Sequence, residues 1–168
     1  MHSDRLDIVK IATCIAVLLL LSSPGYPQRA GGEREFGEIA IVVNSSNPTE
    51  DLSVAEVRRI LLGERMFWAG NVQIKLVLRE RGAKEREQVL SRLLKMNDEA
   101  FDGHWRAKVF RGEAPGEPLA VTTTAQVAQY VTRLPGAIAF MPVKSRSSEL
   151  KIVKLEGRLP GETGYILK

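Results

Sequence analysis

The stretch that decides the fold is Leu52-Ser53-Val54-Ala55-Glu56-Val57-Arg58-Arg59-Ile60-Leu61-Leu62-Gly63-Glu64, which Phe67-Trp68 follows. Ser53 and Glu56 have the spacing of a capping box, in which each side chain accepts a hydrogen bond from the other residue's backbone N–H. Apolar residues recur after Ser53 at helical spacing. Gly63 is a natural end for this helix, because glycine readily adopts the left-handed conformation found there. The stretch therefore predicts an amphipathic helix with one face in a core.

Apolar runs on both sides of this helix predict strands. Residues 39–43 are continuously apolar and rich in branched side chains, which is typical of a buried strand. Residues 72–78 alternate apolar and polar positions. A strand, a helix and a strand in this order predict a right-handed parallel crossover. Further strands are expected at residues 137–141 and 150–155.

Helical spacing recurs in the rest of the chain. A helix is expected at residues 83–95, and Asn97-Asp98 can begin another in which Phe101, Trp105 and Val109 share one face. Trp105 is therefore expected in the core. The hydroxyls of residues 122–124 can cap a last helix. Together these elements predict an α/β domain over residues 38–168, with a small, partly parallel sheet flanked by helices.

The N-terminus has the pattern of a secretory signal peptide. Arg5 and Lys10 precede an apolar run over residues 11–21, and Ser22-Ser23-Pro24-Gly25 ends it. Cleavage is expected after Gly25 or after Ala30. The alternative is an uncleaved membrane anchor, which needs a longer apolar run of about 20 residues. We therefore expect residues 1–25 to be a signal peptide, residues 26–37 a flexible lead-in, and the protein to be periplasmic or otherwise exported.

Composition argues against several kinds of site. The only cysteine, Cys14, lies within the apolar run, and His104 is the only histidine beyond His2. The usual zinc sites and thiol nucleophiles are therefore excluded, and no esterase or phosphate-loop motif is present. The sequence predicts no enzyme, no metal and no cofactor. The 24 basic and 20 acidic residues alternate along the chain, which together with export argues against a nucleic-acid partner.

The order of these features resembles the second half of the phosphate-binding proteins of bacterial ABC importers. In that family a leucine-serine helix ending in glycine precedes a strand, a ligand loop of the form R-S-D-G-S-G-T-T and a late strand of the form P-G-x-I-G-Y. The corresponding stretches here are residues 52–64, Arg79-Glu80-Arg81-Gly82 and Leu134-Pro135-Gly136-Ala137-Ile138-Ala139-Phe140. The resemblance covers about residues 39–140. It implies a single periplasmic-binding-protein-like (PBP-like) domain and a phosphate transporter substrate-binding role, with phosphate or another small oxyanion as partner.

The ligand loop departs from the family pattern after its first matches. Arg79 matches the family's arginine and Gly82 its first glycine. Arg81 stands where the family has the acidic residue that accepts a proton from the ligand. Ala83-Lys84-Glu85-Arg86 replaces Ser-Gly-Thr-Thr, so the hydroxyls are absent and Glu85 would repel an anion. The resemblance therefore implies at most weak binding of an oxyanion.

The residues themselves also indicate where an anion could bind. Ligands of open α/β sheets bind beyond the carboxyl ends of strands, and helix N-termini attract anions. Each candidate has a structural alternative: turn residues in the loop after the first strand, helix caps at residues 122–124, and a solvated basic face for Arg79, Arg81 and Lys84. The candidate anion-binding residues are Ser45, Ser46, Arg79, Arg81, Gly82, Thr123 and Thr124.

Two functional hypotheses follow. The first is an exported PBP-like domain that binds an oxyanion weakly or presents one to a transporter or sensor. The second is a protein-interaction module of the cell envelope that kept the fold and lost ligand binding. The retained Arg79 and Gly82 and the hydroxyl-rich Ser45-Ser46 favour the first hypothesis, and the altered loop from Ala83 favours the second.

Overall fold

The computed structural model describes residues 37–168 of the 168-residue chain. The predicted signal peptide and all of the predicted lead-in except Gly37 lie outside the described residues. Within residues 37–168, no helix is both long enough and apolar enough to cross a membrane.

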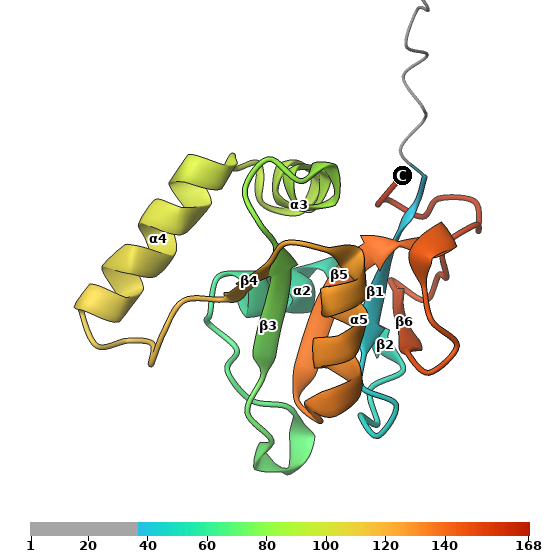
Figure 1. Cartoon of the computed structure of the whole chain (residues 1–168), viewed down its shortest axis with the longest axis horizontal. Helices are drawn as coiled ribbons and strands as arrows, with labels where there is room; N and C mark the ends of the chain where they lie inside the picture. Colours follow the sequence, from blue (N-terminus) through green and yellow to red (C-terminus); the bar gives the residue numbers. More distant parts are fainter. Residues whose placement is uncertain (1–36) are drawn as a thin grey trace, which may run out of the picture. The chain divides into compact units, whose positions relative to one another are not determined.

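The described residues form a six-stranded sheet in the order β2-β6-β1-β5-β3-β4 (Figure 1). β1 is antiparallel to β5 and β6, while β3 is parallel to β4 and β5, so the predicted partly parallel sheet is confirmed. The strands are β1 (Ile39–Val43), β2 (Asp51–Leu52), β3 (Lys75–Arg79), β4 (Leu119–Val121), β5 (Ala137–Pro142) and β6 (Lys151–Leu155). The helices are α2 (Val54–Leu61), η2 (Ala69–Asn71), α3 (Lys84–Val89), the π-helix η3 (Leu90–Leu94), α4 (Asp98–Phe110), α5 (Thr124–Arg133) and η4 (Val143–Ser145).

The predicted parallel crossover between the first two long strands is wrong. β5 lies between β1 and β3, antiparallel to β1 and parallel to β3, so β1 and β3 run in opposite directions. The physical reason is that the late strand β5, buried from Ala137 to Met141, pairs with both. The helix between two strands does not determine which strand becomes the neighbour.

The second long strand also begins later than predicted. β3 starts at Lys75 rather than at residue 72, because the preceding chain folds into a hairpin. In this hairpin Phe67 pairs with Gln73 in an isolated antiparallel bridge, and the Trp68 N–H donates to the Val72 carbonyl at 2.8 Å.

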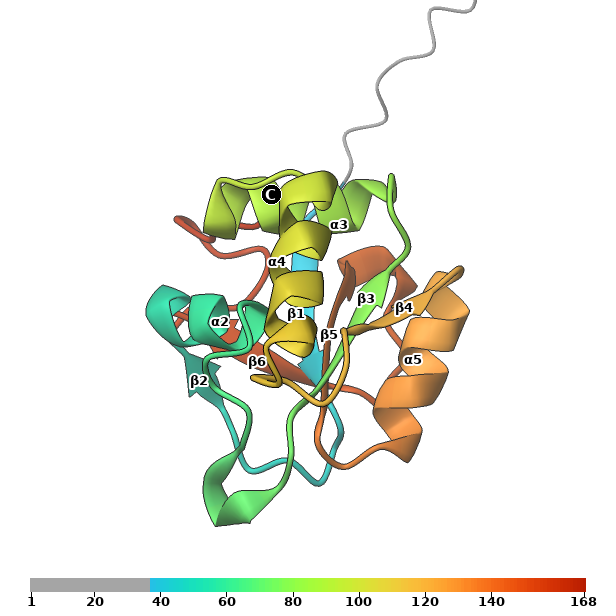
Figure 2. The same ribbon diagram turned by 90° about the vertical axis from the view of Figure 1, so that its left-hand side faces the viewer.

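Helices cover both faces of the sheet (Figure 2). On one face, buried residues of α2, α3, η3 and α4 join Ile39 and Ile41 of β1 in the larger core. On the other face, Val127 and Val131 of α5 pack on Ala40 and Val42. Every residue of β1 is buried, as predicted from its continuous apolar run.

The predicted helix starts are confirmed. Ser53 and Glu56 form the complete capping box, and the backbone hydrogen bond from Ser53 holds the pKa of Glu56 below its usual value. Asn97 accepts a hydrogen bond from the Ala100 N–H at 2.9 Å at the start of α4. Thr123 forms a second capping box with Gln126 at the start of α5. These caps fix where each helix begins.

The hairpin after α2 contacts the start of β5. The Trp68 indole Nε1 donates to the Gly136 carbonyl at 2.9 Å. Gly136 tolerates no side chain, because a Cβ there would lie 2.0 Å from the Gln73 carbonyl oxygen. The hairpin therefore approaches the start of β5 so closely that position 136 requires glycine.

The C-terminal segment, for which the sequence analysis predicted no element, holds the start of β1. The Tyr165 hydroxyl donates to the Ile39 carbonyl at 2.7 Å, and the Ile39 N–H donates to the Leu167 carbonyl at 2.8 Å. Burial raises the pKa of Tyr165 above its usual value, so the phenol stays a donor.

Candidate functional site

Arg79 ends β3 and lies at the centre of the candidate anion site. Its Nη1 donates to Glu85 Oε1 at 2.7 Å and to Thr124 Oγ1 at 3.0 Å. The Arg79 side chain is 18% exposed and the Glu85 side chain 7%. The Arg79 Nε is buried and has no hydrogen-bond partner among the described residues. The structure therefore brings Arg79 and Thr124 together and adds Glu85 to them.

The charge at this centre is largely compensated. Glu85 lies in the first turn of α3 and forms a charge-assisted hydrogen bond to the guanidinium, which is stronger than a neutral one. An anionic ligand that approaches Arg79 would come close to the Glu85 carboxylate. The Glu85 carboxylate therefore lies where it would repel an anion bound to Arg79.

Gly82 and Arg81 are bound by carboxylates of α4 rather than directed at Arg79. The Gly82 N–H donates to Asp98 Oδ2 at 2.9 Å, and the Arg81 Nε lies 3.3 Å from Asp102 Oδ2. Gly82 has a φ of +77°, which favours glycine in this tight turn. The Arg81 side chain is 60% exposed, so it remains at the rim of the site.

Arg86 is the buried charge beneath this loop, and the sequence analysis did not assign it a role. Its Nε donates to Asp98 Oδ1 at 2.6 Å, its Nη1 to the Arg79 carbonyl at 3.1 Å, and its Nη2 to Asp102. Its guanidinium carbon lies 5.4 Å from the centre of the Phe101 ring. Asp98 and Asp102, one helical turn apart on α4, were the available signal for such a partner.

Ser45 and Ser46 lie at the opposite end of the sheet from Arg79. They follow β1, which runs antiparallel to β5 and therefore opposite to β3. Ser46 donates from its N–H and its hydroxyl to Asn44 Oδ1, at 2.9 Å and 2.7 Å. The two serines therefore share no pocket with Arg79.

The turn at Ser46 has a structural role. The buried Asn44 side chain donates to the carbonyls of Val131 and Thr132 at the end of α5, each at 2.8 Å. Thr123, at the other end of α5, is the helix cap, and Thr124 is the hydroxyl that reaches Arg79. Ser46 is thus a turn residue and Thr123 a helix cap, which are the structural alternatives given for them in the sequence analysis.

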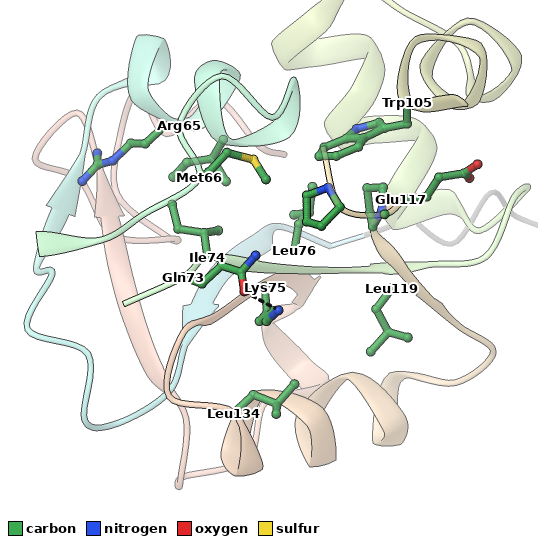
Figure 3. A pocket seen from close by; sticks show the side chains of 14 residues that line it. Arg65, Met66, Gln73, Ile74, Lys75, Leu76, Trp105, Glu117, Leu119 and Leu134 are labelled. Carbon is green, nitrogen blue, oxygen red and sulfur yellow. Dashed lines mark hydrogen bonds between the residues drawn. The ribbon is translucent and has the colours of Figure 1, made fainter. Parts of the chain in front are cut away.

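A groove of about 260 Å³ lies at the other end of β3, away from Arg79 (Figure 3). Its walls come from the end of α2, the hairpin, the start of β3, α4, the loop before β4 and the end of α5. No motif in the sequence predicted it. The lining residues are Ile60, Arg65, Met66, Gln73, Ile74, Lys75, Leu76, Trp105, Pro115, Gly116, Glu117, Pro118, Leu119 and Leu134.

The sequence matches no protein-family model and no curated protein. Its structure is nevertheless similar to solved structures. An ABC-type phosphate transport receptor from Vibrio cholerae has 21% sequence identity and a TM-score of 0.58 over 73% of this chain and 48% of the receptor. A putative phosphate ABC transporter substrate-binding protein with bound phosphate from Clostridium perfringens has 18% identity and a TM-score of 0.60, over 73% of this chain and 46% of its own. PstS from Borrelia burgdorferi has 14% sequence identity and a TM-score of 0.59, over 73% of this chain and 49% of its own.

These similarities establish the fold. The present chain spans less than half the length of each of these three proteins. At these identities the likeness concerns backbone architecture and carries no ligand with it. The resemblance found in the sequence is confirmed at that level: the chain has the α/β fold of part of a phosphate-binding ABC receptor, a partial PBP-like domain.

Proposed function

We propose that this protein is an exported PBP-like domain that binds a small oxyanion weakly at Arg79, with phosphate the first candidate. The observation that carries the proposal is the buried Arg79 Nε without a hydrogen-bond partner, on the guanidinium that also contacts Thr124. Buried donors are nearly always paired in proteins. Nε and the adjacent Nη2 form the edge with which arginine binds an oxyanion bidentately.

Glu85 sets the strength of this binding. Since its carboxylate already accepts from Arg79 Nη1, an oxyanion gains attraction from a guanidinium whose charge is partly compensated. We expect a dissociation constant nearer to millimolar than to micromolar. This corresponds to a binding free energy on the order of −4 kcal/mol. Added salt should weaken the binding, because the exposed Arg81 at the rim of the site contributes to the attraction.

Calorimetry with phosphate and sulfate tests this prediction. Wild type should bind at millimolar concentration, Arg79→Ala should lose binding, and Glu85→Gln should bind about tenfold more tightly because the competing charge is removed. Arg133→Ala, an exposed arginine at the end of α5, is the matched control and should bind like wild type. Thr124→Val gives a second, milder test of the same centre. Equal binding by wild type and Arg79→Ala would contradict the proposal.

The second candidate function is a protein-interaction module of the cell envelope. It is favoured by two carboxylates that contact the loop, Glu85 of α3 on Arg79 and Asp98 of α4 on the Gly82 N–H, which satisfy donors that a ligand would otherwise use. If neither wild type nor Glu85→Gln binds an anion at millimolar concentration, this hypothesis replaces the first. A binding role rather than catalysis is supported by the similar structures, which are described as receptors and binding proteins.

Export rests on the order of basic, apolar and small residues in positions 1–25. We expect the mature protein, isolated from the cell envelope of its source, to begin after Gly25 or after Ala30. N-terminal sequencing measures this directly. An intact Met1 on protein from the soluble cytoplasmic fraction would show that the segment is not a signal peptide.

A further inference from the structure

The groove of Figure 3 lies where the edge of β3 has no neighbouring strand. The Lys75 N–H donates to the Gly136 carbonyl on the β5 side, so the N–H of the next residue, Leu76, faces the other edge. The hairpin covers that edge up to Ile74, whose N–H donates to the Met66 carbonyl at 2.8 Å. β4 begins to pair only where Val77 meets Leu119. Between them, the Leu76 N–H has no backbone acceptor among the described residues.

The groove combines an apolar lining with two cations, Lys75 and Arg65, and one carboxylate, Glu117. Leu76 and Trp105 lie on one side of β3, and Lys75, Leu119 and Leu134 lie on the other (Figure 3). Lys75 Nζ donates to Gln73 Oε1 at 2.7 Å and forms no salt bridge within the described part of the chain. The other cation of the lining, Arg65, is already paired with Glu56 at 2.8 Å.

We propose that this groove binds a small carboxylic acid with an aromatic or branched apolar body. The carboxylate would accept from Lys75 Nζ and from the Leu76 N–H at the edge of β3, while the apolar body packs between Met66 and Trp105 on one side and Leu119 on the other. A volume of about 260 Å³ suits a ligand with an apolar part the size of one large side chain. The groove lies at the opposite end of β3 from Arg79, so this binding is independent of the proposed oxyanion site.

The experiment uses phenylpropionate and its uncharged analogue phenylpropanol, titrated into the protein and followed by calorimetry and by tryptophan fluorescence, to which Trp105 at the groove wall and Trp68 both contribute. Wild type should bind the acid about tenfold more tightly than the alcohol, since only the acid can pair with Lys75. Lys75→Met should remove this preference and keep the binding of the alcohol. Lys154→Met, at an exposed position of β6 outside the groove, should behave like wild type.

A second variant tests the apolar part of the groove. Leu119 is 38% exposed, so Leu119→Trp should fold while it fills the space and abolishes binding of both compounds. The proposal is overturned if wild type binds neither compound at millimolar concentration, or if Lys75→Met retains the preference for the acid. Phosphate titrations of Lys75→Met, expected to match wild type, separate this result from the fate of the Arg79 site.

Discussion

Replacing Arg86 by methionine is expected to lower the free energy of unfolding by about 3–5 kcal/mol, the usual loss when one partner of a buried ion pair is removed. Arg86 is 5% exposed and binds Asp98 and Asp102, which are only 15% and 20% exposed. Without Arg86, two partly buried carboxylates lose their counter-charge, and the Arg79 carbonyl loses its donor. Methionine keeps most of the packing on Phe101, so the loss reports on charge rather than on volume.

The measurement is urea unfolding followed by circular dichroism. Arg106→Met is the matched control, because Arg106 lies on α4, is exposed and forms no salt bridge within the described residues; it should change stability by less than about 0.5 kcal/mol. The triple variant Arg86→Met, Asp98→Asn, Asp102→Asn should recover part of the loss, since it removes the uncompensated charges. Stability of Arg86→Met equal to wild type would show that solvent screens this network and that it contributes little to the fold.

The sequence correctly predicted the features that are determined by residues close together in the chain. The capping residues Ser53, Asn97 and Thr123 begin helices in the structure as expected. A cap is formed within one helical turn, so its evidence is present in a few consecutive residues. The buried strand β1 was equally clear, because burial on both faces requires an unbroken apolar run.

Strand order could not be predicted in the same way. β5 enters the sheet between β1 and β3, and this pairing joins residues about a hundred positions apart in the sequence, such as Ile41 and Phe140. The short edge strand β4 was missed because Leu119 and Ala120 are exposed and show no apolar alternation. A strand of this kind is defined by its partner, β3, rather than by its own residues.

The candidate site was half predictable for the same reason. Arg79 and Thr124 were both expected at ends of elements, and they meet because β3 and β4 are parallel and finish at one edge. Ser45 and Ser46 were expected on equal grounds, but the reversed direction of β1 places them at the other edge. The partners of Gly82 and Arg86 depend on where α4 packs, which local spacing does not contain.

Trp105→Ala is the second large effect, with an expected loss of about 3–5 kcal/mol in the free energy of unfolding, the usual range for truncating a buried aromatic residue. Trp105 is 4% exposed and its ring packs at 6.5 Å, centre to centre, from that of Phe101. Its Nε1 donates to the Leu61 carbonyl at 2.9 Å, so the indole also satisfies the end of α2. Gly63 lies against the same ring: a Cβ there would come within 2.6 Å of it.

The contact with Gly63 makes the effect specific to this side chain. Gly63 itself has no side chain to fill the space that alanine at position 105 would leave, and its φ of +64° disfavours adding one. Trp105→Phe should cost less than alanine, since it keeps an aromatic ring and loses the donor to Leu61. Phe110→Ala, at a side chain 92% exposed on the same helix, should leave stability within about 0.5 kcal/mol of wild type. If Trp105→Ala unfolds at the same urea concentration as Phe110→Ala, the packing of α4 on the end of α2 does not stabilise the domain.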